Sequence, residues 1–311
     1  MKKIKSIISI LLLLTTVSTA YAAKPITLMV GFPPGTGNDL AARQLAKDIT
    51  EAGGPTIVVE NRAGAGGNIA LKEVIDSNGP RLFLHSNSLY LNAIVTKTMT
   101  VDLDTQLIPV SFIGYVPMIL ETGASSSIKK FEDISRVTTE KLTYGSGGIA
   151  SLTHANMAYI SYLLNTPMTH IPYQGASRSL VDLATGRIDL CFDFYNSSMP
   201  FIKDGRVRPL AVTGSKRLKE LPDVPTLKEK GIDWPLEAFY ILFANNHVDK
   251  ETLKTIQTIV AKTLKTNSAS YASQGIQVDT SKSIDIDKFH NNTIKQYQSL
   301  NFPLDVKNEK P

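Results

Sequence analysis

Short apolar runs rich in β-branched residues alternate with segments of helical periodicity along most of the chain. The apolar runs predict strands at 26–31, 56–60, 81–85, 110–120, 142–144, 170–173, 188–194, 208–213 and 236–244. The periodic segments predict helices that include 39–51, 152–164, 177–185 and 250–264. Strands that alternate with helices in this way are typical of α/β architecture with mainly parallel sheets.

Two apolar segments are longer than the others, SFIGYVPMILETG at 111–123 and PLEAFYILFANN at 235–246. Each exceeds the usual strand length of about 5–6 residues. Because strands of this length can cross between two domains, we predict a discontinuous first domain at 24–121 plus 231–311 and a second domain at 122–230. The alternative is that both segments are ordinary strands of one sheet.

The first 23 residues have the pattern of a secretory signal peptide. Lysines precede an uncharged run from Ser6 to Val17, and Ala20-Tyr21-Ala22 provides an Ala-x-Ala cleavage site. The run is shorter than the roughly 20 apolar residues of a membrane-spanning helix. Cys191 is the one cysteine of the chain, so neither an internal disulfide nor a lipid on a processed N-terminal cysteine is expected. We therefore predict a periplasmic protein that is not lipid-anchored.

Charge and histidine spacing argue against nucleic-acid and metal binding. Removing the three signal lysines lowers the basic count from 33 to 30 against 28 acidic residues, so the net charge falls from +5 to +2. No basic stripe of the kind that binds nucleic acid remains. The five histidines stand singly and form no HExxH or paired spacing, so we expect no metal and no cofactor.

Glycine-rich turns follow several predicted strands, where an α/β sheet places its ligands. They read GFPPGTGND at 31–39, NRAGAGGN at 61–68, YGSGGIASLTH at 144–154 and PYQGASRS at 172–179, and HSNS at 85–88 follows another strand. Glycine lets backbone amides approach a ligand, and the first turn of a helix offers unpaired amides at the positive end of its dipole. Such turns attract anions, including carboxylates.

The spacing of residues in these turns argues against nucleotide binding and bears on a second alternative, a serine hydrolase. No lysine follows Gly37, so the first turn is not a Walker loop, and GSGGIA at 145–150 lacks a following acidic residue that would hold a ribose. A serine hydrolase using Ser146, Ser151, His154 and Asp193 stays open as an alternative. Tyr144 breaks the GxSxG pattern around Ser146, however, and Ser151 with His154 fits helix capping better than nucleophile and base.

Five segments in order resemble the substrate-binding proteins of tripartite tricarboxylate transporters, the Bug or TctC family. They are VGFPPGTGNDLAARQLA, VVENRAGAGGNIA, LTYGSGGIASLTHANM, HIPYQGASRSLVDLATGRIDLCFD and VRPLAVTGSKRLKELPDVPTLKEKGI. The resemblance implies a type II periplasmic binding protein fold, two α/β domains joined by two crossing strands around a ligand cleft. It also implies a binding protein rather than an enzyme, which delivers a small organic carboxylate to a membrane permease of one large and one small subunit. We expect it to act as a monomer.

Carried onto this chain, the resemblance implies a ligand site formed by both domains. The first domain would contribute Phe32, Pro34, Gly35, Thr36, Gly37, Asn38, Ser86 and Asn87, with Thr36, Gly37 and Asn38 supplying backbone amides. The second domain would contribute Ser146, Ser151, Thr153, Tyr173, Gly175 and Asp193. The chain departs from the family pattern at SNGPRLFL, 77–84, and at GTGND, 35–39, which leaves the outer end of the ligand less defined.

Several charged residues keep two interpretations. Asp39 either caps its helix or touches ligand, and His154 is either packed at a helix start or a contact. Arg62 and Arg178 either neutralise a second carboxylate or lie on the surface. Asp193 favours a hydroxy acid or amino acid over a plain dicarboxylate, unless it is turned away. A receptor that presents its ligand to a membrane histidine kinase remains a second possible function.

Overall fold

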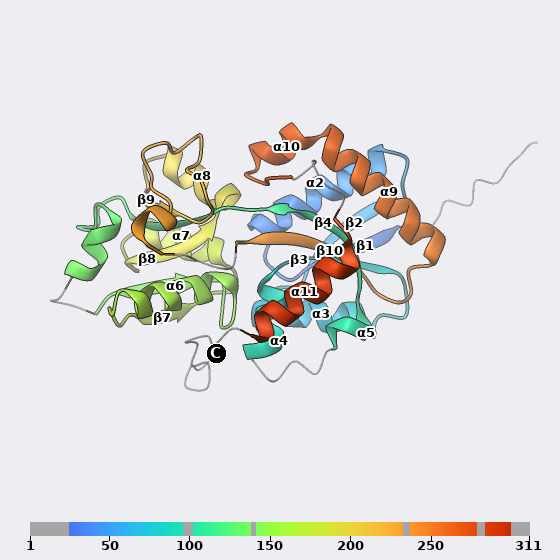
Figure 1. Cartoon of the computed structure of the whole chain (residues 1–311), viewed down its shortest axis with the longest axis horizontal. Helices are drawn as coiled ribbons and strands as arrows, with labels where there is room; N and C mark the ends of the chain where they lie inside the picture. The colour runs from blue at the N-terminus through green and yellow to red at the C-terminus, as the bar shows by residue number, and fades with distance from the viewer. Residues whose placement is uncertain (1–24, 96–101, 138–140, 233–236, 279–283, 300–311) are drawn as a thin grey trace, which may run out of the picture.

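The computed structural model describes residues 25–95, 102–137, 141–232, 237–278 and 284–299, and all structural statements refer to these ranges. The predicted signal peptide at 1–23 and the predicted strand start at 236 lie outside them. Two five-stranded sheets lie side by side, and helices cover both faces of each sheet (Figure 1). We call the parts built on these sheets the first and the second domain.

The first sheet has the strand order β2-β1-β3-β10-β4. Its strands are β1 (Ile26–Val30), β2 (Ile57–Asn61), β3 (Arg81–Ser86), β4 (Ile108–Tyr115) and β10 (Phe239–Ala244). Its helices are α2 (Gly37–Glu51), η1 (Ala65–Gly67), α3 (Asn68–Asp76), α4 (Ser88–Val95), α5 (Leu103–Gln106), α9 (Lys250–Thr266), α10 (Ser268–Ser273) and α11 (Ile286–Gln298). Successive strand residues point to opposite faces, so Leu28 packs toward α2 and α9 whereas Met29 packs toward α3 and α4.

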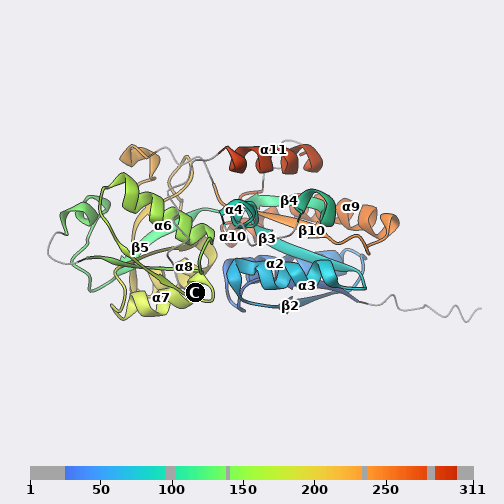
Figure 2. The same ribbon diagram turned by 90° about the horizontal axis from the view of Figure 1, so that it is seen from below.

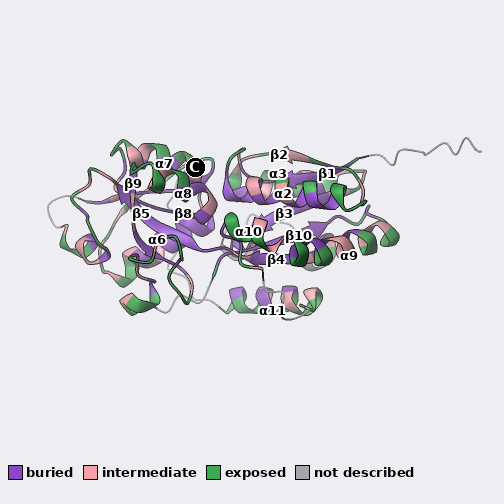
Figure 3. Ribbon diagram, turned by 90° about the horizontal axis from the view of Figure 1, so that it is seen from above, coloured by how far each residue is buried: buried purple, intermediate pink, exposed green. Residues whose placement is uncertain are grey.

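The second sheet has the strand order β7-β6-β8-β5-β9. Its strands are β5 (Met118–Gly123), β6 (Thr143–Ser146), β7 (Thr169–Pro172), β8 (Leu190–Phe194) and β9 (Val207–Val212). Its helices are η2 (Phe131–Arg136), α6 (Leu152–Leu163), α7 (Ala176–Ala184), α8 (Tyr195–Lys203) and η3 (Lys228–Lys230). Phe192 packs with Met157 of α6, and its neighbour Cys191 packs with Leu180 of α7. As Figure 3 shows, the central strands are buried, whereas the outer faces of α9 and α11 are exposed. The edge strands β2 and β7 are only partly buried.

Two connections between the domains lie next to each other. The chain leaves the first sheet after β4 and enters the second at β5, and it returns before β10. The amide of Val116 donates to the carbonyl of Ala238 at 2.7 Å, which ties the outgoing connection to the returning one. Tyr115 and Gln277 exchange two further backbone hydrogen bonds of 3.1 and 2.7 Å. The two domains are therefore joined by one pair of adjacent chain segments, and Figure 2 shows the same arrangement from a second side.

The predicted long strand at 110–120 is wrong in detail. It consists of β4 and β5 with a break at Val116 and Pro117, because proline has no N–H for the strand ladder. The predicted domain boundary after residue 121 falls inside β5. The returning strand β10 has six residues and lies wholly within the first sheet.

The expectation of mainly parallel sheets is also wrong, because the sheets are mixed. Four strand pairings are parallel and four are antiparallel. All four antiparallel pairings involve β5 or β10, the strands that follow the two crossings. The local βα pattern predicts the parallel pairs correctly, but it carries no information on strands that enter a sheet from the other domain.

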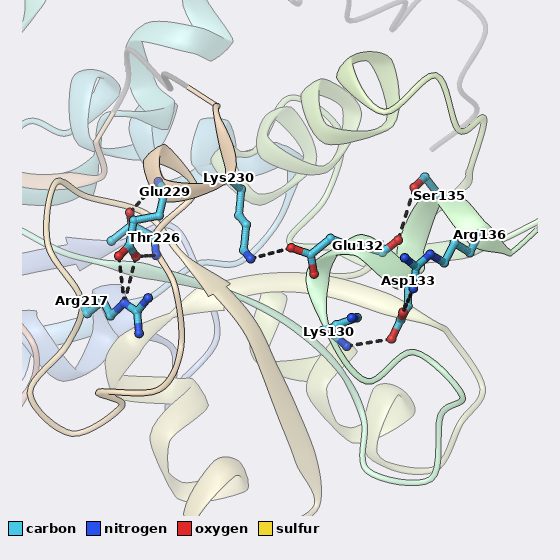
Figure 4. A network of polar contacts seen from close by, with 9 residues as sticks. All are labelled: Lys130, Glu132, Asp133, Ser135, Arg136, Arg217, Thr226, Glu229 and Lys230. Carbon is cyan, nitrogen blue, oxygen red and sulfur yellow. Dashed lines mark hydrogen bonds and ion pairs between the residues drawn. The ribbon is translucent and has the colours of Figure 1, made fainter.

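Polar contacts anchor the irregular segment that follows β9 to the second domain (Figure 4). Arg217 donates to Glu229 at 2.9 Å, and Glu229 also accepts from the amide of Thr226 at 2.7 Å. Lys230 donates to Glu132 of η2 at 2.5 Å. Each exposed ion pair contributes only about 0–1 kcal/mol. Together they fix the position from which the chain returns to the first domain.

Candidate functional site

A small cavity of about 20 Å³ lies between the two domains. A space of this size has room for about one water molecule, so an organic ligand requires the two domains to move apart. The cavity is lined by Phe32, Thr36, Asn38, Ser86 and Ser88 of the first domain and by Gly147, Ser151, Leu152, Thr153, Ala176, Asp193 and Phe194 of the second. Every polar side chain in that set is buried. A ligand can therefore enter or leave only when the domains separate.

Five helices begin at this cavity. The starts of α2 and α4 come from the first domain, and those of α6, α7 and α8 come from the second. The first amides of a helix have no partner within the helix, and they carry the positive end of its dipole. No described side chain caps α2 or α7. The convergence creates a site for an anion without a lysine or arginine in the described lining.

The turn before α2 is held rigid by its own polar groups. Thr36 Oγ1 donates to the carbonyl of Pro33 at 2.8 Å, and the Thr36 amide donates to the same carbonyl at 3.4 Å. Asp39 accepts from the amide of Gly35 at 2.9 Å and from Arg43 Nε at 3.0 Å. Asp39 thus organises the turn from behind and does not line the cavity. The amides that remain for a ligand are those that follow Thr36.

The second-domain wall is built around the start of α6. Ser151 accepts from the amide of His154 at 3.2 Å and so caps α6. The hydroxyls of Ser151 and Thr153 lie 3.0 Å apart, and Thr153 Oγ1 accepts from the amide of Gly147 at 2.8 Å. These contacts fix the cavity-lining hydroxyls in place.

Asp193 is the one ionisable side chain in the described lining of the cavity. Its Oδ1 accepts from the amide of Phe194 at 2.7 Å, whereas its Oδ2 has no hydrogen-bond partner among the described residues. Burial raises the pKa of Asp193 to about 7, and the hydrogen bond from Phe194 only partly opposes this. The carboxyl therefore changes charge near neutral pH.

Direct contacts hold the two domains together around the cavity. Asn196 Nδ2 of α8 donates to the carbonyl of Gly37 at 3.2 Å. A β-carbon at Gly175 would lie 2.8 Å from Pro33 Cδ of the other domain, so the backbones approach closely there. Gly175 also has a φ of 117°, a conformation that glycine tolerates. Both contacts exist only while the domains are closed.

The cavity brings together about half of the predicted site residues, namely Phe32, Thr36, Asn38, Ser86, Ser151, Thr153 and Asp193. Gly37 and Gly175 lie beside it, in the closing contacts. Pro34 and Gly35 are exposed in the turn. Asn87 points to Tyr297, to which it donates at 2.7 Å, and the Tyr173 hydroxyl donates to Asp182 at 2.9 Å.

The remaining candidates are placed away from the cavity lining. Ser146 Oγ lies 2.6 Å from His170 Nε2, and His154 stacks on the same ring with centroids 3.9 Å apart. Arg62 forms a surface ion pair with Glu73, and the exposed Arg178 bonds Gln174. The Ser151 hydroxyl accepts from the backbone amide of His154, which is the contact of a helix cap.

Five lining residues were not predicted, namely Ser88, Gly147, Leu152, Ala176 and Phe194. Each lies within two positions of a predicted residue, so the correct turns were identified but not the individual side chains. None of the described helices combines the length and hydropathy that a bilayer crossing requires. Nor do three metal-ligating side chains gather anywhere in the described ranges.

Comparison with known proteins places the chain in a family. Residues 41–301 match the family model described as "Tripartite tricarboxylate transporter family receptor". The chain belongs to this receptor family. A family relative encoded in the tcbD–tcbE intergenic region of Pseudomonas sp. (strain P51) is 32% identical over 231 residues, 71% of this chain and 69% of that protein. BugT of Bordetella pertussis is 26% identical over 265 residues, 82% and 81% of the two chains.

Solved structures agree with the receptor fold. Rpa4515 of R. palustris, solved with adipate, has a TM-score of 0.81 and 26% identity over 89% of this chain and 95% of that chain. The periplasmic binding protein BugD has a TM-score of 0.81 and 23% identity over 88% and 94% of the two chains, which supports the fold alone. The predicted family and type II binding-protein fold are confirmed. As a member of this receptor family, the chain is a periplasmic solute-binding protein and not an enzyme.

Proposed function

We propose that this receptor captures a small organic carboxylate between its domains and presents the closed complex to a tripartite tricarboxylate-type permease of one large and one small subunit. The convergence of five helix N-termini on one buried cavity carries the proposal, because unpaired amides and helix dipoles favour a carboxylate. That a relative at 26% identity was solved with adipate supports the same ligand class. We propose that the receptor acts as a monomer in the periplasm.

Ligand binding would drive closure because the ligand touches both domains at once. It gains its full set of contacts only in the closed state, so it shifts the population toward that state. The adjacent connections at Val116 and Ala238 are the segments that would absorb the motion.

A thermal-shift screen against small mono-, di- and tricarboxylates, hydroxy acids, amino acids and aromatic acids tests the ligand class. A ligand at 100 times its Kd stabilises the folded protein by about 2.7 kcal/mol, which raises Tm measurably. Ala176 is buried and lines the cavity, so the larger side chain of Ala176→Leu would occupy the cavity and abolish the ligand-induced rise in Tm. The control Ala261→Leu, on the exposed side of α9, would keep it. Failure of every acid to shift Tm would reject the proposal.

Transport and signalling are separated by a genetic test. If the receptor serves a permease, deleting its gene abolishes uptake of the labelled ligand, and wild type but not Ala176→Leu restores uptake. If it serves a membrane histidine kinase instead, deletion removes kinase activation and leaves uptake unchanged.

A further inference from the structure

The cavity offers buried hydrogen-bond acceptors as well as donors. Asp193 Oδ2 and Asn38 Oδ1 are both buried without a hydrogen-bond partner among the described residues. One belongs to each domain, both residues line the cavity, and their exposures are 1% and 2%. A buried acceptor without a partner is unfavourable, so both oxygens call for a donor from the ligand.

The surroundings of Asp193 provide no positive charge. No described cationic side chain pairs with it. The hydroxyls of Ser177 and Ser197 lie near the carboxyl and oppose the rise in its pKa, but neither makes a direct hydrogen bond to Oδ2 in the structure. The titratable groups that face it are Glu121, Cys191 and Tyr240, and burial raises the pKa of all three. Burial therefore disfavours a negative charge on each of these neighbours.

Two aromatic rings complete this part of the wall. Phe32 and Phe194 line the cavity from opposite domains, and Phe194 stacks on Tyr240 with centroids 5.6 Å apart. Aromatic faces attract cations, and the attraction is stronger where water is excluded. A carboxylate, an amide oxygen and two rings are together suited to an organic cation.

We propose that the ligand is a small zwitterion of the amino acid type, whose ammonium group donates to Asp193 Oδ2 and Asn38 Oδ1 while its carboxylate meets the helix N-termini. The inference rests on the proposed function and narrows its ligand class. An ammonium has three donors and a positive charge, so it can satisfy both acceptors and balance the buried acid. A hydroxyl has one donor, and a second carboxylate at this position would be repelled by Asp193.

The test compares acids that share a carbon skeleton and differ only at the second carbon. Titration calorimetry would rank L-aspartate, L-malate and succinate, then L-glutamate, 2-hydroxyglutarate and glutarate, then L-alanine, L-lactate and propionate. In each series that binds, the amino acid should bind at least tenfold tighter than its hydroxy and unsubstituted counterparts. The reason is that a hydrogen bond between an ammonium and a carboxylate is stronger than one between neutral groups.

Variants separate this inference from general acid binding. Asp193→Asn should remove the preference for the ammonium group, whereas the control Asp204→Asn, an exposed acid of the same domain, should keep it. If Asp193→Asn does not fold, the wild-type ranking in the three series decides. Equal or tighter binding of the hydroxy or unsubstituted acids overturns the inference and leaves the proposed function intact. Failure of all acids to bind rejects the proposed function itself.

Discussion

Replacing Gly37 by alanine would test whether ligand binding depends on the close contact between the domains. Gly37 is the first residue of α2, and a β-carbon there would lie 2.6 Å from Asn196 Oδ1 and 3.0 Å from Phe194 Cβ of the other domain. It would also lie 2.5 Å from the Tyr240 hydroxyl, which belongs to the same domain as Gly37. Two of the three contacts are with the other domain, so the substitution should destabilise the closed state more than the open one.

The magnitude follows from the cost of overpacking. An added carbon in a tightly packed contact typically costs about 1–3 kcal/mol. If the closed state alone bears this cost, ligand binding weakens by roughly 5- to 150-fold. In the open state only the contact with the end of the Tyr240 side chain remains. The affinity for ligand should consequently fall by more than the stability of the ligand-free protein.

Calorimetry with the best ligand of the screen, together with small-angle X-ray scattering, measures both effects. Wild type should contract when ligand is added, and Gly37→Ala should need a correspondingly higher ligand concentration to contract. Gly79→Ala is the matched control, because a β-carbon at Gly79 would meet nothing within 4 Å. An affinity of Gly37→Ala within twofold of wild type would refute the closing contact.

Three further predictions concern the domain contact and the buried acids. Asn196→Ala removes the hydrogen bond to the Gly37 carbonyl, worth about 0.5–1.5 kcal/mol, so ligand should dissociate roughly 2- to 10-fold faster in stopped-flow measurements; an unchanged rate would contradict this. Glu121 accepts a hydrogen bond from Ser198, and burial raises the pKa of Glu121 well above 4.5. Above about pH 4.5 the unfolded chain loses a proton that the folded protein retains, so the stability of the folded protein falls as the pH rises. Glu121→Gln should flatten that fall in thermal melts, and parallel curves for both proteins would argue against it. An ammonium ligand needs Asp193 ionised, so its affinity should rise by up to about tenfold per pH unit toward pH 7 and level off above; Asp193→Asn should show no such rise.

Local sequence patterns were sufficient to predict the positions of the strands. Alternating apolar runs located nearly all strands within a few residues, and β1 and β6 lie where the runs at 26–31 and 142–144 predicted them. Pairing direction could not be obtained in the same way, because β5 and β10 join their sheets only after the chain has crossed between domains. The break at Pro117 was visible in the sequence, and its missing N–H explains the division into two strands.

The site could be predicted to the level of turns and not of side chains. The glycine-rich turns marked four helix starts, and Asp193, which the sequence singled out, lines the cavity. Side-chain direction depends on contacts distant in sequence. Asn87 turns to Tyr297, which is 210 positions away, and Ser146 turns to His170, so neither lines the cavity. The neighbours Ser88 and Gly147 take those places.

A crystal structure of the receptor with the ligand found in the screen tests the central claim most directly. The account predicts a carboxylate between the domains, within hydrogen-bond distance of amides at the starts of both α2 and α6 and enclosed by Thr36, Ser151 and Thr153. A ligand bound elsewhere, such as the surface groove lined by Tyr115, Lys216 and Gly275, with this cavity unchanged, would contradict it.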